Sequence, residues 1–411
     1  MATTRTCLHS RLESVFFRCL KRCTPPSTPS VRHHPTPSAL STMALTETAP
    51  LLGSNQPHIP SAPWSKALPS ARDPARRLPQ AIAHRGYKSR YPENSMAAFR
   101  AAVSVGTHAI ETDIHLSADH EVVLSHDGNL KRCFGVDKPV SACPWSYLAT
   151  LRSLRAPHEP MPRLVDLLRY LAEPGRDKIW ILLDVKVDDD PDALLSAVAD
   201  AVDAVPRSDG LAWDQRIVVG CWTQDFLHAS LRHLPSYSSA HISHSPYNSN
   251  RFLDCPEYAG LSFNMLQPTL VGPYGKRFIQ RVRAAPDAEE RRLYVWTVNQ
   301  VEWMEWSIEK GMDGVVTDDP AAYLDVLKRW EEAAAEGSET GSNAAEQQAS
   351  SGIESHPPVA AKTTVTGLRR WTWLYVQVAA IQVLLVLLTP WLARRSRWKF
   401  TKPSKKSVPK A

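Results

Sequence analysis

Imidazole, guanidinium and carboxylate side chains stand at the ends of several short apolar runs in this 411-residue sequence. His84 and Arg85 end the first run, and a glycine follows them, which lets the backbone turn sharply. Glu111 and Asp113 lie two positions apart in the run at 109–116, so a strand would place both carboxylates on one face. A charged group at the end of a buried strand must be solvated, form an ion pair, or take part in binding or catalysis.

Further polar residues repeat this pattern later in the chain. Asp184 and Lys186 lie two positions apart in the run at 178–187, and His126 follows the run at 121–125. Three carboxylates that converge on one place raise one another's pKa values unless a cation lies between them. Oxygen ligands without cysteine or imidazole favour Mg²⁺ or Ca²⁺. Other runs end in Trp296, Asn299, Thr317 and Asp318.

These residue types suit the hydrolysis of a phosphodiester. Two histidines would supply a base for the attacking oxygen and an acid for the leaving oxygen. Arg85 and Lys186 would hold the nonbridging oxygens of the phosphate, and the arginine can do so with two parallel hydrogen bonds. Lys186 has the simpler alternative of an ion pair with Asp184, and both roles are compatible.

Eight β-rich apolar runs recur between residues 81 and 328, with amphipathic stretches such as 162–173 and 191–205 between most of them. This alternation is typical of a parallel sheet covered by helices, and eight repeats predict a (β/α)8 TIM barrel, with reactive groups at the C-terminal ends of its strands. A doubly wound open sheet is the alternative, although no Gly-rich nucleotide loop follows the first run. The eight runs are 81–86, 109–116, 178–187, 216–222, 238–243, 260–265, 293–299 and 314–318.

Five separated motifs, in this order, resemble the glycerophosphodiester phosphodiesterase family: HRG (84–86), PENS (92–95), ETD (111–113), SHD (125–127) and DGVVTDDP (313–320). The resemblance covers about residues 80–328. It implies a barrel of the PLC-like phosphodiesterase type, one divalent metal ion and a pair of histidines.

The resemblance also implies roles for individual residues. The catalytic histidines would be His84 and His126, and the metal ligands Glu111, Asp113 and Asp184. The phosphate contacts would be Arg85 and Lys186. From the residues themselves we add Trp296, as a ring that stacks on substrate or packs in the core, and Glu93 and Asn94, as supports of His84 and the first loop.

Two positions depart from the family pattern. Ser95 replaces a threonine and keeps the hydroxyl, and Asp184 replaces the common glutamate of an E-x-K pair. With the apolar C-terminal segment and the stretch HEPMPRLVDLLRYL (158–171), the chain looks closest to the fungal-type phosphatidylglycerol phospholipase C branch, which implies cleavage to diacylglycerol and glycerol phosphate. A glycerophosphodiester or lysophospholipase D-type activity, similar to that of sphingomyelinase D-like enzymes, is the alternative. A non-enzymatic tail-anchored adaptor would not need this set of residues.

The charge distribution restricts the partners that suit this chain, and the cysteines indicate its redox compartment. The net charge of +6 comes from the two ends, because residues 1–44 carry +5 and residues 394–411 carry +8. The remaining body is mildly acidic, which argues against a nucleic-acid partner. The seven cysteines are odd in number and lack zinc-site spacing, so the sequence predicts a reducing compartment and no disulfide scaffold.

Composition divides the rest of the chain. Residues 1–80 are expected to be disordered, with a possible mitochondrial targeting segment or a true start at Met43, and residues 329–368 read as a low-complexity linker. Residues 371–393 contain no charged residue and are flanked by arginines, which predicts a transmembrane helix before the basic tail 394–411. The expected protein is therefore tail-anchored in the endoplasmic reticulum or mitochondrial outer membrane, with its catalytic domain in the cytosol.

Overall fold

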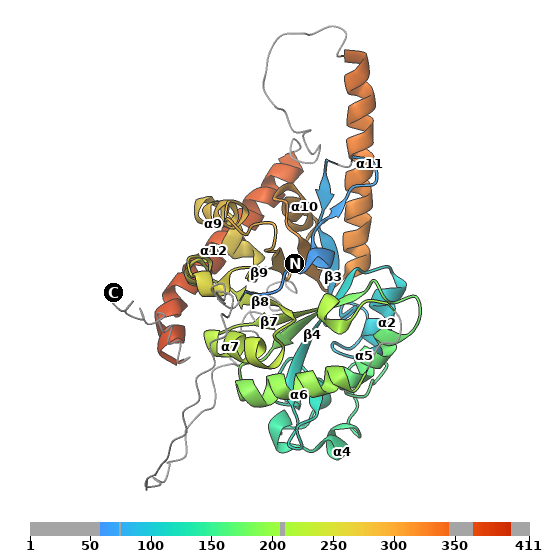
Figure 1. Cartoon of the computed structure of the whole chain (residues 1–411). Helices are drawn as coiled ribbons and strands as arrows, with labels where there is room; N and C mark the ends of the chain where they lie inside the picture. Colours follow the sequence, from blue (N-terminus) through green and yellow to red (C-terminus); the bar gives the residue numbers. More distant parts are fainter. Residues whose placement is uncertain (1–57, 74, 206–209, 345–364, 396–411) are drawn as a thin grey trace, which may run out of the picture. The chain divides into compact units, whose positions relative to one another are not determined.

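The computed structural model describes residues 58–73, 75–205, 210–344 and 365–395. Within these residues, eight parallel strands pair in the order β3-β11-β10-β9-β8-β7-β6-β4, and β4 pairs with β3 to close a barrel (Figure 1). The predicted TIM barrel is confirmed, and each strand lies within one of the eight expected runs or extends one residue beyond it. The strands are β3 Gln80–His84, β4 Ala109–Leu116, β6 Trp180–Val185, β7 Ile217–Cys221, β8 Ser238–Ser243, β9 Ser262–Leu266, β10 Leu293–Trp296 and β11 Gly314–Thr317.

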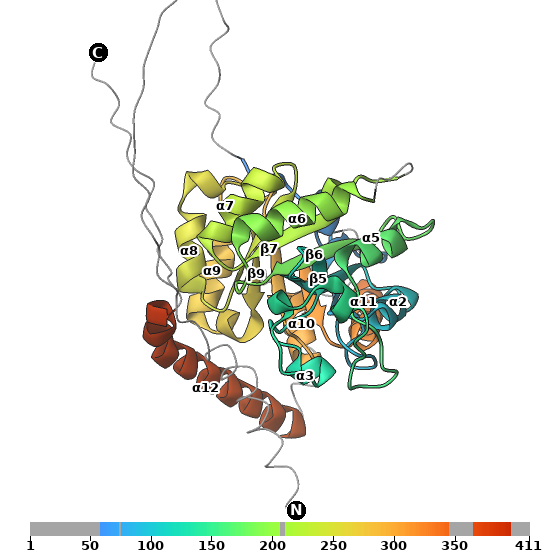
Figure 2. The same ribbon diagram turned by 90° about the horizontal axis from the view of Figure 1, so that it is seen from below.

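Helices follow the strands and surround the barrel (Figure 2). These helices are α2 Met96–Ser104, α5 Leu164–Ala172, α6 Pro191–Asp203, α7 Gln224–His233, α8 Pro246–Leu253, α9 Pro273–Arg283, α10 Val301–Glu309 and α11 Pro320–Ala344. Short 3₁₀ turns join them at η4 Trp213–Gln215, η5 Pro256–Tyr258 and η6 Gln267–Leu270. Polar N-caps help to set where the helices begin. Ser95 caps α2 by accepting a hydrogen bond from the backbone N–H of Ala98, and Asp190 caps α6 by accepting one from the backbone N–H of Ala193.

The strands bury both faces, which explains their near-continuous apolar sequences. In β4, Ile110 and Ile114 belong to the large core between strands and helices, whereas Ala109 belongs to a small core with Leu182 and Val218 inside the barrel. Because side chains alternate along a strand, the residues two and four positions after Ala109 also face the barrel interior. The two acidic residues of β4 are therefore directed inward.

One long excursion separates β4 from α5. Its first part, β5 Val122–Leu124, pairs antiparallel with β4, and the rest contains α3 Lys131–Phe134, η3 Val140–Ala142 and α4 Trp145–Leu148. Val123, Leu130 and Leu148 are the centre of a separate small core that holds this excursion together. It carries His126 to the edge of the barrel.

Residues 58–80 lie in the segment that the sequence analysis expects to be disordered, and the structure describes most of them as packed on the barrel. They include η2 Pro63–Ser65 and the antiparallel pair β1 Leu68–Pro69 and β2 Arg77–Leu78. The Ser65 hydroxyl lies 2.6 Å from the Tyr294 hydroxyl, and the Gln80 amide donates to the Trp64 carbonyl at 2.7 Å. The expected targeting segment at the N-terminus falls on residues 1–57, outside the described residues, as do residues 345–364 of the expected linker and 396–411 of the basic tail. Residues 329–344, expected to belong to the linker, are part of α11.

The predicted transmembrane anchor is wrong. Among the described residues, no helix combines the length and the apolar character that crossing a bilayer requires. The charge-free segment lies in α12 Val365–Arg395, where Leu374 and Val378 belong to the main core. The Gln382 amide donates to the carbonyl oxygens of Pro268 at 2.8 Å and Val271 at 2.9 Å. Sequence composition indicated an apolar segment without showing that it packs on protein, and the single-pass membrane localisation is withdrawn with it.

Candidate active site

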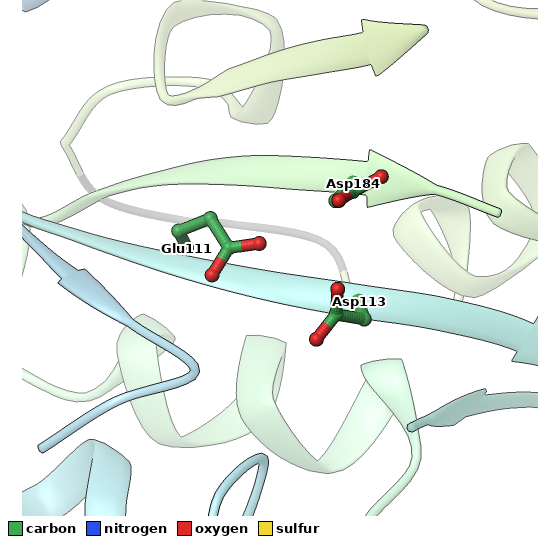
Figure 3. Close-up of side chains that lie close together, drawn as sticks. All are labelled: Glu111, Asp113 and Asp184. Carbon is green, nitrogen blue, oxygen red and sulfur yellow. The ribbon is translucent and has the colours of Figure 1, made fainter. Parts of the chain in front are cut away.

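Three buried carboxylates meet on the neighbouring strands β4 and β6 (Figure 3). Glu111 and Asp113 come from β4, and the strand register places Asp113 directly beside Asp184 of β6. One oxygen from each carboxylate lies within 4.8 Å of the other two. The spacing read from the sequence therefore brings the three acids into one cluster.

Two cations already compensate part of this negative charge. The Lys186 ammonium lies 2.6 Å from Oδ1 of Asp113 and 2.6 Å from Oδ2 of Asp184. The Arg85 Nε lies 3.0 Å from Oδ2 of Asp113. Glu111 accepts the backbone N–H of Arg85 at 2.9 Å, and among the described residues no lysine or arginine side chain forms an ion pair with it. The ion pair between Lys186 and Asp184, which the sequence offered as an alternative, is therefore present.

Because Glu111 and Asp113 have different cationic neighbours, their pKa values shift in opposite directions. Burial, followed by the negative charges of Asp113 and Asp184, raises the pKa of Glu111 well above its ordinary value. Burial acts in the same direction on Asp113, but the positive charges of Arg85 and Lys186 outweigh it and hold the pKa of Asp113 well below its ordinary value. Glu111 is therefore the acid whose ionised form most needs a further cation.

A tight turn after β3 aims Arg85 at the cluster. Arg85 and Gly86 both adopt left-handed backbone conformations, with φ of 57° and 77°. A Cβ atom at position 86 would lie 2.7 Å from the carbonyl carbon of Ala98 in α2, so glycine allows this helix to approach the turn. The sequence HRG thus specifies both the end of the strand and the direction of the guanidinium.

The residues of the PENS motif contact Arg85 of this turn and Asp113 of the acidic cluster. The Glu93 carboxylate lies 2.8 Å from Nη1 of Arg85, and the Asn94 amide donates to Oδ2 of Asp113 at 2.8 Å. Ser95 caps α2, which confirms that the hydroxyl is what this position requires. Glu93 and Asn94 therefore contact the arginine and one carboxylate of the triad.

His84 is held by a residue from the other end of the barrel sequence. Its Nδ1 lies 2.5 Å from Oδ1 of Asp318, which follows β11. Asp318 also lies 3.2 Å from the Lys88 ammonium and accepts the Asn299 amide at 3.0 Å. Burial, followed by the positive charge of Arg85, lowers the pKa of His84 to about 4. Its imidazole is therefore neutral near pH 7, as a general base must be.

His126, which lies between β5 and α3, also has an aspartate at its Nδ1. Its Nδ1 lies 2.8 Å from Oδ1 of Asp127, and Nε of Arg132 in α3 donates to the other oxygen of Asp127 at 2.6 Å. Burial, followed by the charge of Lys186, lowers the pKa of His126. In both histidines a carboxylate engages Nδ1, which leaves Nε2 for another partner.

Aromatic rings line another side of the cluster. The Trp222 indole N–H donates to Oδ1 of Asp184 at 2.7 Å, and its ring centroid lies 6.0 Å from the Lys186 ammonium. Trp296 packs edge-on against Trp222 with ring centroids 5.6 Å apart, and its own N–H donates to the Asn264 carbonyl at 3.1 Å. Trp296 is only half-buried, so part of its surface remains accessible beside the site.

Comparison with known proteins agrees with this geometry. The glycerophosphoryl diester phosphodiesterase family matches residues 84–322, which is more than half of the chain. The chain belongs to this family. Its members hydrolyse phosphodiester bonds, so the chain is a phosphoric diester hydrolase.

The relatives and solved structures extend over the same region. A lysophospholipase D from Mus musculus is 28% identical over 291 residues, which covers 64% of this chain and 91% of the relative. A probable glycerophosphodiester phosphodiesterase from Mycobacterium tuberculosis is 26% identical and covers 60% of this chain and 90% of its own. A phosphodiesterase from Oleispira antarctica, solved with the product sn-glycerol-3-phosphate, is similar in fold, with a TM-score of 0.52, 19% identity and coverage of 61% and 97%.

The acidic cluster fits a divalent cation. Three carboxylates offer oxygen ligands within 4.8 Å of one another, and hard cations such as Mg²⁺ and Ca²⁺ prefer such ligands. Lys186 does not complete the charge balance, because it pairs with Asp113 and Asp184 and leaves Glu111 without a cationic side chain. The residues present therefore suit a bound metal ion.

Direct contacts join seven of the ten residues singled out from the sequence: Arg85, Glu93, Asn94, Glu111, Asp113, Asp184 and Lys186. The other three, His84, His126 and Trp296, contact Asp318, Asp127 and Trp222, respectively. Sequence reasoning did not find Lys88, Arg132 and Trp222. Trp222 ends an expected strand, which was the one available signal, whereas Lys88 lies in a turn and Arg132 in a four-residue helix, and neither shows a periodic pattern. Asp127 and Asp318 were noted at strand ends without a role, and their contacts with the histidines now supply one.

Proposed function

We propose that this site hydrolyses a phosphodiester bond of a glycerophospholipid, with Mg²⁺ or Ca²⁺ held by Glu111, Asp113 and Asp184. The observation that carries the proposal is the placement of two histidines, each engaged at Nδ1 by an aspartate, beside a buried carboxylate cluster. A structural role alone does not require two imidazoles, each oriented by an aspartate, beside three acids.

Arg85 and Lys186 are the residues we assign to the phosphate. Both side chains are nearly buried, with exposed fractions of 12% and 11%, and both already lie against anionic oxygens of Asp113. When a phosphodiester enters, its nonbridging oxygens would take up part of these contacts. A bound divalent cation would add positive charge where negative charge builds up on the phosphoryl group.

The histidines are assigned to proton transfer. His84, as a neutral imidazole, would accept a proton from the attacking hydroxyl, of water or of the headgroup. His126 would act as an imidazolium, whose charged form the hydrogen bond with Asp127 favours, and would donate its Nε2 proton to the departing alcohol oxygen. The bond from phosphorus to the attacking oxygen forms as the bond to the leaving oxygen breaks. Asp318 and Asp127 support these assignments because each accepts a hydrogen bond at Nδ1 and directs Nε2 toward the reaction.

For the substrate, we propose phosphatidylglycerol and phospholipase C-type cleavage to diacylglycerol and glycerol phosphate. The support is the resemblance of residues 158–171 (HEPMPRLVDLLRYL) to the fungal-type branch. Asp184, in place of the usual glutamate, is compatible with both this reaction and the lysophospholipase D-type alternative. The half-buried Trp296 would contact the glycerol portion of the headgroup. This substrate is a bulkier lipid than the glycerophosphodiesters for which several relatives are named.

A second candidate is lysophospholipase D-type or glycerophosphodiester cleavage. The relative from Mus musculus, named a lysophospholipase D, matches over 91% of its own length and favours this reaction. The two candidates use the same catalytic residues and differ in which ester bond to phosphorus breaks.

Product identity distinguishes the candidates. Purified full-length chain is incubated with detergent-dispersed phosphatidylglycerol, lysophosphatidylcholine or glycerophosphocholine, and products are identified by mass spectrometry. Diacylglycerol with glycerol phosphate supports the first candidate, and lysophosphatidic acid or glycerol phosphate with free choline supports the second. A chain that hydrolyses none of the three, with Mg²⁺ or Ca²⁺ present, contradicts both.

A further inference from the structure

One arginine outside the proposed site connects the two loops that supply its histidine and its phosphate-binding arginine. Arg132 lies in the short helix α3 of the excursion, and its three guanidinium nitrogens all contact carboxylates. Nε donates to Oδ2 of Asp127 at 2.6 Å. Nη1 and Nη2 donate to the two oxygens of Glu93 at 2.8 Å and 2.7 Å.

Each carboxylate that Arg132 binds also binds a residue of the site. The other oxygen of Asp127 lies 2.8 Å from Nδ1 of His126. Oε1 of Glu93 lies 2.8 Å from Nη1 of Arg85. A continuous ionic chain therefore runs from His126 to Arg85, and Arg132 is its middle member.

We propose that Arg132 is a positioning residue for the hydrolysis, which orients His126 through Asp127 and braces Arg85 through Glu93. The inference rests on the proposed function, in which His126 protonates the leaving oxygen. The planar guanidinium suits this role because it binds two carboxylates along separate edges, whereas a lysine ammonium presents a single point of charge.

The two ends of the chain depend on Arg132 to different degrees. Arg85 keeps a direct contact with Asp113 at 3.0 Å when Arg132 is removed, so phosphate binding is largely preserved. Asp127 loses the guanidinium that holds its second oxygen, and its carboxylate becomes free to rotate away from His126. Loss of Arg132 should therefore impair proton donation more than substrate binding.

Two variants test this role, Arg132→Gln and Arg132→Lys, each in the full-length chain with Mg²⁺ or Ca²⁺ present. Lys131→Gln is the matched control, because Lys131 is the neighbouring cation of α3 and pairs with Asp137 at an exposed position. Each protein is assayed with the alkyl phosphodiester that the wild-type chain hydrolyses best and with a p-nitrophenyl phosphodiester. The p-nitrophenolate ion leaves without a proton, so its release does not need a general acid.

We expect Arg132→Gln to lower kcat for the alkyl substrate by about 10–100-fold, the usual effect of removing a supporting partner, with KM changed by less than about 3-fold. Turnover of the p-nitrophenyl substrate should stay within about 3-fold of wild type. Arg132→Lys should behave like Arg132→Gln, and Lys131→Gln like wild type. Thermal unfolding of each variant reports whether the fold persists.

Three outcomes would overturn the inference. Equal loss on both substrates would show a merely structural role, and unchanged turnover in Arg132→Gln would show no role. Full activity in Arg132→Lys would show that positive charge suffices without the bridge. If the wild-type chain hydrolyses neither substrate, the proposed function fails instead, so the two failures are distinguishable.

Discussion

His84 and Asp318 are separated by 234 positions in the sequence, yet Nδ1 of the histidine lies 2.5 Å from Oδ1 of the aspartate. Closure of the barrel explains this, because β3 and β11 are the first and last strands and pair directly with each other. The turn after β3 and the turn after β11 therefore face each other at the same end. The contact fixes the imidazole for a role in proton transfer.

The histidine pair gives the first prediction. His84→Ala and His126→Ala should each lower kcat by at least about 100-fold, the scale for losing a general acid or base. The double variant should lose much less than the product of the two single losses, because the pair acts as a unit. Steady-state kinetics with circular dichroism as a folding control measures this. A single variant that is folded and retains near-normal turnover would show that its histidine is structural.

The pH dependence of the reaction follows from the environment of His84. A general base must be neutral, so activity is lost as the pH falls through the pKa of His84, which burial lowers to about 4. The acid limb of kcat/KM should therefore lie well below pH 6. Lys88→Gln should move this limb to higher pH, because the positive charge of Lys88 contributes to the lowered pKa. An acid limb near pH 6.5 in the wild type, or no shift in Lys88→Gln, would contradict this explanation.

The sequence predicted the barrel well because its signals are local. All eight strands coincide with apolar runs, and the period of two in β4 was enough to place Glu111 and Asp113 on one face. The contacts of Arg132 and Trp222 could not be predicted, because they depend on loops whose paths no periodicity specifies. The C-terminal segment was predicted wrongly. Its charge-free composition was taken to indicate a transmembrane helix, and composition could not show that Gln382 contacts the η6 region of the barrel.

Metal dependence is the third prediction. Dialysis against excess EDTA should abolish turnover, and Mg²⁺ or Ca²⁺ should restore it, because Glu111 forms no ion pair with a lysine or arginine in the described part of the chain. The restoring ion should also raise the melting temperature of the dialysed wild type and leave that of Glu111→Gln unchanged, since binding to the folded state alone stabilises it. Full activity after dialysis in EDTA would contradict a metal-dependent mechanism.

The turn that aims Arg85 gives a prediction about stability. Gly86→Ala combines a left-handed backbone with a Cβ atom 2.7 Å from the carbonyl carbon of Ala98. Gly175→Ala is the matched control, because its φ is 83° but nothing lies within 4 Å of the added Cβ. Urea unfolding should show that Gly86→Ala lowers the free energy of unfolding by about 1–3 kcal/mol more than the control does. Equal losses of unfolding free energy in the two variants would mean that the close approach of α2 does not exclude a Cβ atom at position 86.

Phosphodiester hydrolysis by the histidine–carboxylate site is the central claim, and oxygen-18 incorporation tests it most directly. Purified full-length chain is incubated with phosphatidylglycerol, lysophosphatidylcholine and glycerophosphocholine in ¹⁸O-labelled water with Mg²⁺ or Ca²⁺, and the phosphomonoester is analysed by mass spectrometry. The account predicts one labelled oxygen on the phosphorus of the product, and almost no product from the His84→Ala, His126→Ala double variant. Absence of a labelled phosphomonoester from every substrate, or equal product from the double variant, would contradict it.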